Sequence, residues 1–241
     1  MRNILVSGAT RGLGLGVARK LASDGFQVIA IGRKPTDELS AAIEEARCGA
    51  IAFRPFDLME TERIPSFIRD LKGEFGPFYG LVNNAGLGAE GLLATMSAGR
   101  IEAVIRLNTL APILLSKSVV RSMLSEGSGR IVNMASIIAF TGYNGLSVYA
   151  ATKASMIGFT RSLAREVGRA GITVNAIAPG FIDTDMTQGM PAEQRERVAR
   201  RSALRRLAEV EDVANSASFL ISDAARNITG TVLTVDAGST A

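Results

Sequence analysis

The sequence predicts a single α/β domain built on a doubly wound parallel β-sheet, and three observations lead to this prediction. Short apolar runs alternate with amphipathic stretches along all 241 residues. The apolar runs are continuous, which is typical of strands buried on both faces. A composition of 47% hydrophobic and 21% charged residues is that of a globular chain with one sizeable core. We therefore expect parallel strands joined by helices on both faces of the sheet.

Seven short apolar runs predict the strands. They cover residues 4–6, 28–31, 51–53, 79–82, 131–133, 173–177 and 232–235. Five further stretches predict helices, at residues 12–23, 37–47, 110–124, 147–168 and 210–222. The third helix has Pro112 near its start, where a helix tolerates proline. Because the sequence shows no internal repeat, linker or low-complexity tract, residues 1–241 are expected to form one Rossmann-type domain.

The composition excludes several kinds of catalytic site. The chain has no histidine and a single cysteine, Cys48. A Ser-His-Asp or Cys-His mechanism is therefore excluded, and so is a zinc site of the usual ligands, so that no metal is expected. No disulfide can form within the chain, which fits a reducing cytoplasm.

Charge and apolar pattern point away from a membrane or a nucleic acid as partner. The net charge of +4 is mild. The first apolar stretch is about four residues long, against ~7–15 for a signal-peptide core. We expect no segment that approaches the ~20 apolar residues of a membrane span. The one dense basic run, residues 195–206, is either a solvated helix face or a landing site for an acidic partner or a phosphorylated substrate.

A glycine-rich turn follows the first expected strand and opens the first helix, with the spacing Gly-x-x-x-Gly-x-Gly. Glycines there let backbone N–H groups approach a pyrophosphate, and the positive end of the helix dipole faces the same anion. The alternative is an ordinary strand-to-helix turn, but this context at the N-terminus favours a dinucleotide site. The residues of the turn expected to contact the cofactor are Gly8, Thr10, Arg11, Gly12, Leu13 and Gly14.

The residues after the second strand favour NADP(H) over NAD(H). An NAD site places an acidic residue about 20 residues beyond the glycine turn, where it holds the ribose 2′-hydroxyl. This chain has Arg33 and Lys34 there. A guanidinium can bind a 2′-phosphate bidentately, whereas an acidic group would repel it, and Arg11 could lie on the same side. The alternative is that Arg33 and Lys34 only solvate a loop.

Tyr149 and Lys153 are candidates for proton transfer. Their i, i+4 spacing places them on one face of the fourth expected helix. A free phenol has a pKa near ~10, and a neighbouring ammonium is expected to lower that pKa. Tyr149 could then give a proton to a carbonyl oxygen. The alternative is a half-buried tyrosine beside a snorkelling lysine.

Ser136 is the third candidate catalytic residue. It follows the expected strand at residues 131–133, and open α/β sheets bind ligands at the carboxyl ends of their strands. Its hydroxyl could hold the substrate oxygen beside Tyr149. The alternative is a serine that only caps a turn.

Together these motifs resemble the short-chain dehydrogenase/reductase family over essentially the whole chain. The matching residues are Gly8-x-x-x-Gly12-x-Gly14, Asp57, Asn83-Asn84-Ala85-Gly86, Asn108, Ser136, Tyr149, Lys153 and Pro179-Gly180. The resemblance implies that Asn108, Ser136, Tyr149 and Lys153 are catalytic, with Asn108 at a helix irregularity where it holds a water of the proton relay. It also implies cofactor contacts from Asp57, Leu58, Asn84, Ala85, Gly86, Tyr149, Lys153, Pro179, Gly180, Ile182 and Thr184.

Within this family the chain is most similar to the 3-oxoacyl-[acyl-carrier-protein] reductases, through residues 178–187 and 228–231. The similarity implies NADPH as cofactor and a homotetramer. Three departures are visible, one of them the absence of the methionine-bearing tail that is usual in this group. Ser7 replaces the usual threonine of the glycine turn, and Leu146 and Val148 stand where this group has Gln and Asn, which predicts a more apolar pocket mouth.

Two regions are expected to serve the substrate. Residues 183–201 are expected to form a mobile lid that excludes water from the pocket. Arg130 and Arg169 flank the pocket in sequence and, together with the basic run at 195–206, could receive an acidic carrier protein.

The leading hypothesis is NADPH-dependent reduction of a 3-oxoacyl thioester on acyl carrier protein to the 3-hydroxyacyl form, with Tyr149 as proton donor. A second hypothesis keeps the chemistry but changes the substrate to an acyl-CoA, a sugar, a steroid, a dihydrodiol or another secondary alcohol. A third is a non-catalytic, cofactor-sensing binding protein, because fold alone does not establish function. The complete set of Asn108, Ser136, Tyr149 and Lys153 argues against the third, since a binding protein need not keep a proton donor.

Overall fold

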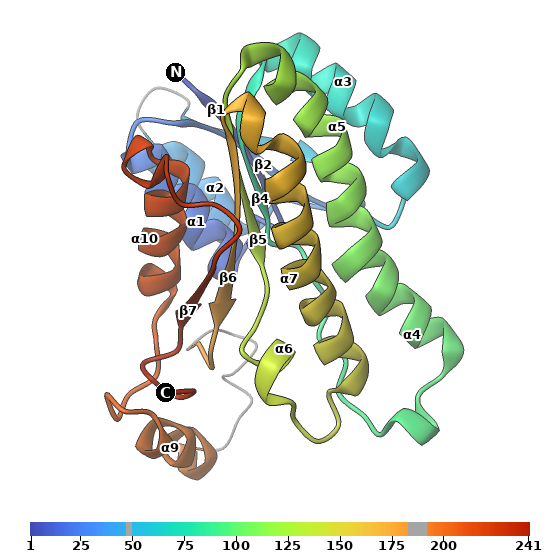
Figure 1. Cartoon of the computed structure of the whole chain (residues 1–241), viewed down its shortest axis with the longest axis vertical. Helices are drawn as coiled ribbons and strands as arrows, with labels where there is room; N and C mark the ends of the chain where they lie inside the picture. Colours follow the sequence, from blue (N-terminus) through green and yellow to red (C-terminus); the bar gives the residue numbers. More distant parts are fainter. Residues whose placement is uncertain (47–49, 183–191) are drawn as a thin grey trace.

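The computed structural model describes residues 1–46, 50–182 and 192–241, and the sheet within them has seven parallel strands in the order β3-β2-β1-β4-β5-β6-β7 (Figure 1). The strands are β1 Asn3–Ser7, β2 Gln27–Gly32, β3 Ile51–Pro55, β4 Phe78–Asn83, β5 Gly129–Met134, β6 Ile172–Pro179 and β7 Val232–Val235. Each contains one of the seven predicted runs. The predicted Rossmann-type α/β fold with about seven strands is therefore confirmed.

Helices cover both faces of the sheet and enclose two hydrophobic cores. One core lies under α1 Gly12–Ser23, α2 Asp37–Glu45 and α10 Val210–Ile221, and the other under α3 Ile64–Phe75, α5 Ala111–Glu126 and α7 Ser147–Val167. Successive strand residues point to opposite faces, so that Ile4 and Val6 join the first core while Leu5 joins the second. This two-sided burial explains why the strands are continuous apolar runs.

Several helices were not expected from the sequence. They are α3, α4 Ala98–Ile105, the short α6 Ile138–Thr141, and α9 Ala192–Arg201, which occupies the second half of the expected lid. The other half, residues 183–191, lies outside the described residues. The helix predicted at 37–47 ends at Glu45, and the one predicted at 110–124 is α5.

One continuous helix, Ala98–Glu126, is long and apolar enough to cross a membrane by length and composition alone. The expectation that no segment approaches this criterion is therefore wrong. Less than half of its most apolar window is buried, but α5, its longer part, packs against β4, β5 and α3. This packing is that of a core helix in an α/β domain.

Candidate active site

The predicted site residues gather at the carboxyl ends of the strands. Ser7 ends β1, Asn83 ends β4 and Met134 ends β5. The strand order reverses between β1 and β4, because β2 and β3 lie on one side of β1 while β4 to β7 lie on the other. Open α/β sheets bind ligands at such a switch point, outside the carboxyl ends of the strands.

The glycine turn after β1 packs directly against the segment after β4. A Cβ atom on Gly14 would lie 2.1 Å from the Gly8 carbonyl oxygen, and one on Gly8 would lie 2.8 Å from Ala85 Cα. Gly8 also has φ of +65°, in the left-handed region that favours glycine. A side chain is therefore excluded at Gly8 and at Gly14, the two points where the turn approaches other backbone most closely.

Hydrogen bonds from Ser7 and Asn84 lock the two segments together. The Ser7 hydroxyl accepts from the N–H groups of Asn84 (3.0 Å) and Ala85 (3.1 Å). The Asn84 amide donates in return to the carbonyls of Ser7 and Gly8, both at 3.1 Å. A serine supplies the hydroxyl that these contacts need, so the departure at Ser7 leaves the turn intact.

The N-terminus of α1 is suited to a phosphate group. No side chain caps the helix, and a Cβ on Gly12 would meet nothing within 4 Å. The first turn of a helix has N–H groups without intrahelical partners, and these bind anions. A bare turn, an uncapped helix end and open space in front of it fit the pyrophosphate of a dinucleotide.

The basic groups near this turn fit the 2′-phosphate of NADP(H). Arg11 and Arg33 are exposed, and across the described ranges neither forms an ion pair. Thr10 lies between the two, because a Cβ on Gly32 would be 2.4 Å from Thr10 Cγ2. The turn and the end of β2 are thus adjacent, which places both arginines at the same corner of the sheet.

Asp57 and Leu58 are both predicted to contact the cofactor, but only Asp57 has a side chain outside the hydrophobic core. One carboxylate oxygen of Asp57 accepts from the Met59 N–H at 2.9 Å, which orients the side chain. The Leu58 side chain is buried in the core on the α3 side of the sheet. Only the backbone of Leu58 is therefore left for a cofactor.

Tyr149 and Lys153 lie one turn apart on α7, with Lys153 Nζ 5.7 Å from the centre of the Tyr149 ring. The Lys153 ammonium is buried and donates to the Met134 carbonyl at 2.8 Å. A Cβ on Gly86 would lie 3.6 Å from Lys153 Nζ and 3.3 Å from Asn108 Oδ1. Gly86 thus brings backbone close to both side chains.

Burial sets the pKa of both residues. It raises the pKa of Tyr149, and a hydrogen bond with Ser136 opposes the rise. Burial also lowers the pKa of Lys153 to about 8. The net lowering of the Tyr149 pKa that the sequence predicts is not found, because the ammonium donates to the Met134 carbonyl and desolvation of the phenol outweighs the opposing effects. At neutral pH Tyr149 holds a proton to donate, and Lys153 is charged.

Asn108 lies in a π-helical turn, Arg106–Leu110, between α4 and α5, which is the helix irregularity that the resemblance implies. Its Oδ1 accepts from the Leu87 N–H at 2.7 Å, and its Nδ2 donates to the Leu87 carbonyl at 2.9 Å and to Thr152 Oγ1 at 3.2 Å. These bonds tie the loop after β4 to the helix that carries Tyr149. π turns frequently mark functional positions.

Ser136 and the Pro179-Gly180 segment complete this edge. Ser136 Oγ accepts from the Ile138 N–H at 3.3 Å, and the Pro179 carbonyl accepts from the Ile137 N–H at 3.0 Å. A Cβ on Gly180 would lie 2.6 Å from Asp236 Cβ, so the chain passes very close to the end of β7 here. Ile182 is buried and forms a bridge with Ala208, whereas Thr184 lies outside the described residues.

Comparison with known proteins supports a dinucleotide-dependent enzyme. Residues 8–240 match a family model described as enoyl-(acyl carrier protein) reductase. A structure of a short-chain type dehydrogenase/reductase from Mycobacterium ulcerans is 33% identical, with a TM-score of 0.92 over 99% of this chain and 89% of that one. The chain belongs to the short-chain dehydrogenase/reductase family. It is therefore an oxidoreductase of the NAD(P)-dependent type.

Other relatives of this short-chain dehydrogenase/reductase have more specific names. The 3-oxoacyl-[acyl-carrier-protein] reductase FabG of Haemophilus influenzae is 39% identical over 97% of this chain and 96% of that protein. The FabG of Escherichia coli is 38% identical over 97% and 95%. A gluconate 5-dehydrogenase from Burkholderia cenocepacia, in complex with NADP and tartrate, has a TM-score of 0.93 at 28% identity over 99% and 95%.

Some predicted pocket residues of this dehydrogenase/reductase lie elsewhere. Arg130 is the second residue of β5, and Arg169 lies in the turn before β6, so both are at the amino ends of the strands, opposite Ser136. Their closeness to the site residues in sequence is therefore not closeness in space, because strand β5 separates Arg130 from Ser136, and binding of an acidic carrier protein stays a prediction. Val148 is buried and packs with Ala89 and Val104 in a small cluster, and the more apolar pocket mouth stays a prediction.

Sequence reasoning also missed residues that support the site of this dehydrogenase/reductase. Thr152 accepts from Asn108 and donates to the Tyr149 carbonyl at 2.8 Å. Its position between Tyr149 and Lys153 on the same helix was the available signal. Tyr143, whose ring meets that of Phe181 edge-on at 6.4 Å, had no signal in the sequence, because the two lie in separate loops.

Proposed function

We propose that this chain reduces the ketone of a 3-oxoacyl thioester, carried by acyl carrier protein, to a secondary alcohol with NADPH. The observation that carries the proposal is that Ser136, Tyr149 and Lys153 converge at the carboxyl edge of the sheet, near the segment after β4 that packs against the glycine turn. The FabG relatives of 38–39% identity support the choice of substrate. A cytoplasmic location, which the single cysteine fits, belongs to the same proposal.

The roles of the residues follow from their protonation states. A bound reduced nicotinamide supplies the hydride for the substrate carbon. The Tyr149 hydroxyl gives its proton to the substrate oxygen, and the Ser136 hydroxyl donates a hydrogen bond to the same oxygen. The Lys153 ammonium favours the phenolate left on Tyr149, which it could not stabilise as a neutral amine. Asn108 holds the loop after β4 and, as the resemblance implies, a water through which Tyr149 regains its proton.

Preference for NADPH is assigned to Arg33, with help from Arg11. Arg33→Asp is expected to raise KM for NADPH about 100-fold, because a phosphate contact is replaced by repulsion, each tenfold step being about 1.4 kcal/mol. KM for NADH should change much less. Parallel assays with both cofactors check this, and an equal rise for both would contradict the assignment.

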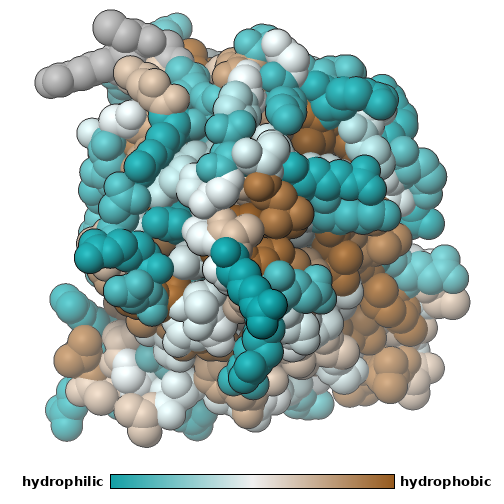
Figure 2. Space-filling model, turned by 45° about the horizontal axis from the view of Figure 1, so that its top comes forward, coloured by the Kyte–Doolittle hydropathy of each residue, from teal (hydrophilic) through white to brown (hydrophobic). Residues whose placement is uncertain are grey.

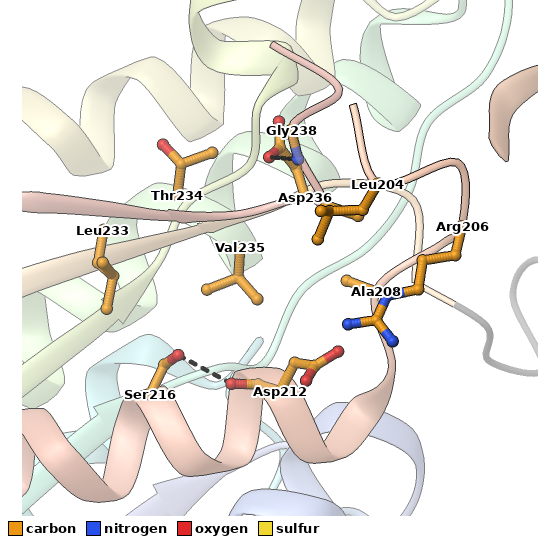
Figure 3. A pocket seen from close by; sticks show the side chains of 11 residues that line it. Leu204, Arg206, Ala208, Asp212, Ser216, Leu233, Thr234, Val235, Asp236 and Gly238 are labelled. Atoms are coloured by element: carbon orange, nitrogen blue, oxygen red, sulfur yellow. Dashed lines mark hydrogen bonds between the residues drawn. The ribbon is translucent and has the colours of Figure 1, made fainter. Parts of the chain in front are cut away.

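We also propose the homotetramer that the family resemblance implies, and two surfaces support it. Ile105, Leu110 and Leu124 on the continuous helix Ala98–Glu126 are exposed apolar side chains, and Figure 2 shows an apolar area on that side of the molecule. The second surface is the open edge of β7. Beside it, α10 and residues around Leu204 enclose a hollow of about 360 Å³, which Figure 3 shows with Val235 and Asp212 on opposite walls. Analytical ultracentrifugation tests the tetramer.

Turnover of a 3-oxoacyl thioester, followed by oxidation of NADPH and NADH in parallel, tests the proposed reaction. Activity with NADPH on the thioester is expected. A second candidate function, oxidation of a sugar acid, is favoured by the gluconate dehydrogenases among the similar structures, with TM-scores of 0.94 and 0.93. Gluconate with NADP⁺ belongs in the same panel, and turnover of gluconate without turnover of any thioester would replace the proposal.

A further inference from the structure

A cavity of about 640 Å³ lies between the loop after Ser136, helix α9 and the last residues of the chain. In Figure 1, α6, α9 and the C-terminus lie together at this end of the molecule. The residues that line the cavity are Ile137, Ile138, Thr141, Gly142, Tyr143, Phe181, Glu193, Arg197, Val198, Arg201, Ser239 and Thr240. None of these residues has a role in the chemistry proposed above.

One wall of the cavity is apolar and begins at the candidate catalytic residues. Ile137 and Ile138 directly follow Ser136, and Phe181 directly follows Gly180. The Tyr143 ring meets the Phe181 ring edge-on, at an interplanar angle of 69°. This wall suits the carbon chain of a substrate whose carbonyl lies at Ser136.

The part of the lining that α9 supplies carries an excess of positive charge. Arg197 and Arg201 lie one turn apart on α9 and therefore share a face. Their neighbour Arg200 forms an ion pair with Glu196 at 3.2 Å, whereas within the part of the chain that the structure describes no ion pair involves Arg197 or Arg201. Glu193 also lines the cavity, so that two guanidinium groups face one carboxylate and leave a net positive charge.

The end of the chain holds the hydroxyl groups of the cavity in place. The Asp236 carboxylate accepts from the Thr240 N–H at 2.9 Å and the Thr240 hydroxyl at 2.8 Å. The Gly238 carbonyl accepts from the Ala203 N–H at 3.1 Å, which fixes this tail to the base of α9. Ser239 and Thr240 are thus held in the lining of the same cavity as Arg201, where they add polar groups.

We propose that Arg197 and Arg201 bind a phosphate group on the arm of the thioester substrate, at the end remote from the reacting ketone. Guanidinium forks bind phosphate bidentately, and the apolar wall leads from this site towards Ser136. The phosphate belongs to a pantetheine arm, whether that arm is free or attached to a carrier protein. This inference rests on the proposed function and names the part of the substrate that determines affinity.

A matched pair of substrates tests the inference: 3-oxobutyryl-pantetheine and the same thioester carrying a 4′-phosphate. Replacing both arginines (Arg197→Gln with Arg201→Gln) is expected to raise KM for the phosphorylated thioester about tenfold and to leave its kcat unchanged. KM for the neutral thioester should stay the same. Arg200→Gln is the control, because Arg200 lies on the same helix but pairs with Glu196, and it should affect neither substrate. Equal changes for both thioesters in the double variant would overturn the inference.

Direct binding separates failure of this inference from failure of the proposed reaction. Calorimetric titration of 4′-phosphopantetheine into the NADP⁺-saturated protein should give a Kd about tenfold weaker in the double variant than in the wild type or Arg200→Gln. This comparison holds even if no thioester is turned over, and an unchanged Kd would refute the site. A loss seen only with carrier-bound substrate would assign the arginines to the carrier's acidic surface and would also overturn the inference.

Discussion

Two tyrosines at opposite edges of the sheet each lie beside a cation, and only one of them has the properties of a proton donor. Tyr149 has Lys153 Nζ 5.7 Å from its ring centre, at the carboxyl edge. Tyr79, at the start of β4, has the guanidinium carbons of Arg2 at 4.2 Å and Arg130 at 5.4 Å from its ring centre. Burial raises the pKa of both tyrosines.

The partners of the two hydroxyl groups make the difference. Tyr79 donates to the Asp223 carboxylate at 3.0 Å, and Arg2 binds both oxygens of that carboxylate. Its cations are arginines, which keep their charge at any working pH. Tyr149 has instead the Ser136 hydroxyl as partner and a lysine whose pKa of about 8 lies near neutrality. Tyr149 therefore has a hydroxyl without a carboxylate acceptor and a neighbouring cation that can titrate, whereas Tyr79 has neither.

The largest expected effect that tests this comparison is on turnover. Tyr149→Phe should lower kcat by a factor of about 10² to 10⁴, the usual contribution of a general acid, because the proton donor is lost. Tyr79→Phe should leave kcat within about twofold of the wild type, since it removes only a bond to Asp223 at the other edge. Rates of NADPH oxidation decide between the two, with NADP⁺ binding measured to show that each variant still folds. Comparable losses in both variants would break the comparison.

Lys153→Met should raise the free energy of unfolding at pH 7, by up to about 3 kcal/mol. The lysine pKa is near 8 in the folded protein and 10.5 in the unfolded chain, so folding at pH 7 carries the cost of burying an ammonium. The free energy of unfolding of the wild type should therefore rise with pH between about 8 and 10.5, because the unfolded chain binds more protons than the folded protein there. The difference in stability between Lys153→Met and the wild type shrinks over the same range. The bond to Met134 that is lost offsets part of the gain.

Arg130→Met is the matched change at the other edge and should destabilise the protein at every pH. Arg130 is buried, contacts the Tyr79 ring, and donates to the Gly129 carbonyl at 2.8 Å. Urea unfolding at pH 7 and pH 10 measures both variants. A loss of stability in Lys153→Met at pH 7 would show that the buried ammonium is not a cost.

The pH dependence of kcat should show an alkaline limb near pH 8. As pH rises through the pKa of Lys153, the ammonium loses its proton and the phenolate of Tyr149 loses its stabilising charge, so that kcat falls by up to about tenfold per pH unit. Lys153→Arg should have a lower kcat but no such limb. A limb of the same position in this variant would assign the titration to another group.

The smallest expected effect is that of Asp223→Asn. This change removes the charge that pairs with Arg2 while leaving an acceptor for Tyr79, and the side chain of Asp223 is 61% exposed. Exposed ion pairs contribute about 1 kcal/mol or less, so the free energy of unfolding should fall by no more than that. Urea unfolding measures it, and kcat serves as the control. A tenfold fall in kcat would show that this cluster acts on the site after all.

Periodicity and motif spacing predict most of the fold and the gathering of the site residues. The seven strands follow from continuous apolar runs, and α1 from the glycine turn that opens it. Helix α3 was missed although Ile64, Ile68 and Leu71 have helical spacing, because Pro65 and Gly73 interrupt the pattern. Propensity alone treats those two residues as breaks, whereas proline at the start of a helix is tolerated.

The properties that the sequence could not supply depend on burial and on the direction of side chains. The rise in the pKa of Tyr149 comes from desolvation, which no spacing reveals. Arg130 stands six residues before Ser136 but at the other edge of the sheet, since a strand separates them. Arg197 and Arg201 line the same cavity as Tyr143 although they lie far from it in the sequence. Only the three-dimensional structure brings these residues together.

The π turn at Arg106–Leu110 has a consequence for the helix that contains it. Such a turn holds one residue more than a regular helical turn, and each residue rotates a helix by about 100°. Because the extra residue is accommodated within that one turn, deleting Thr109 would let α4 and α5 continue as a regular α-helix with the side chains on either side still in phase. What the deletion would remove is the local outward displacement of the backbone at Asn108, and with it the contacts of this side chain with Leu87 and Thr152.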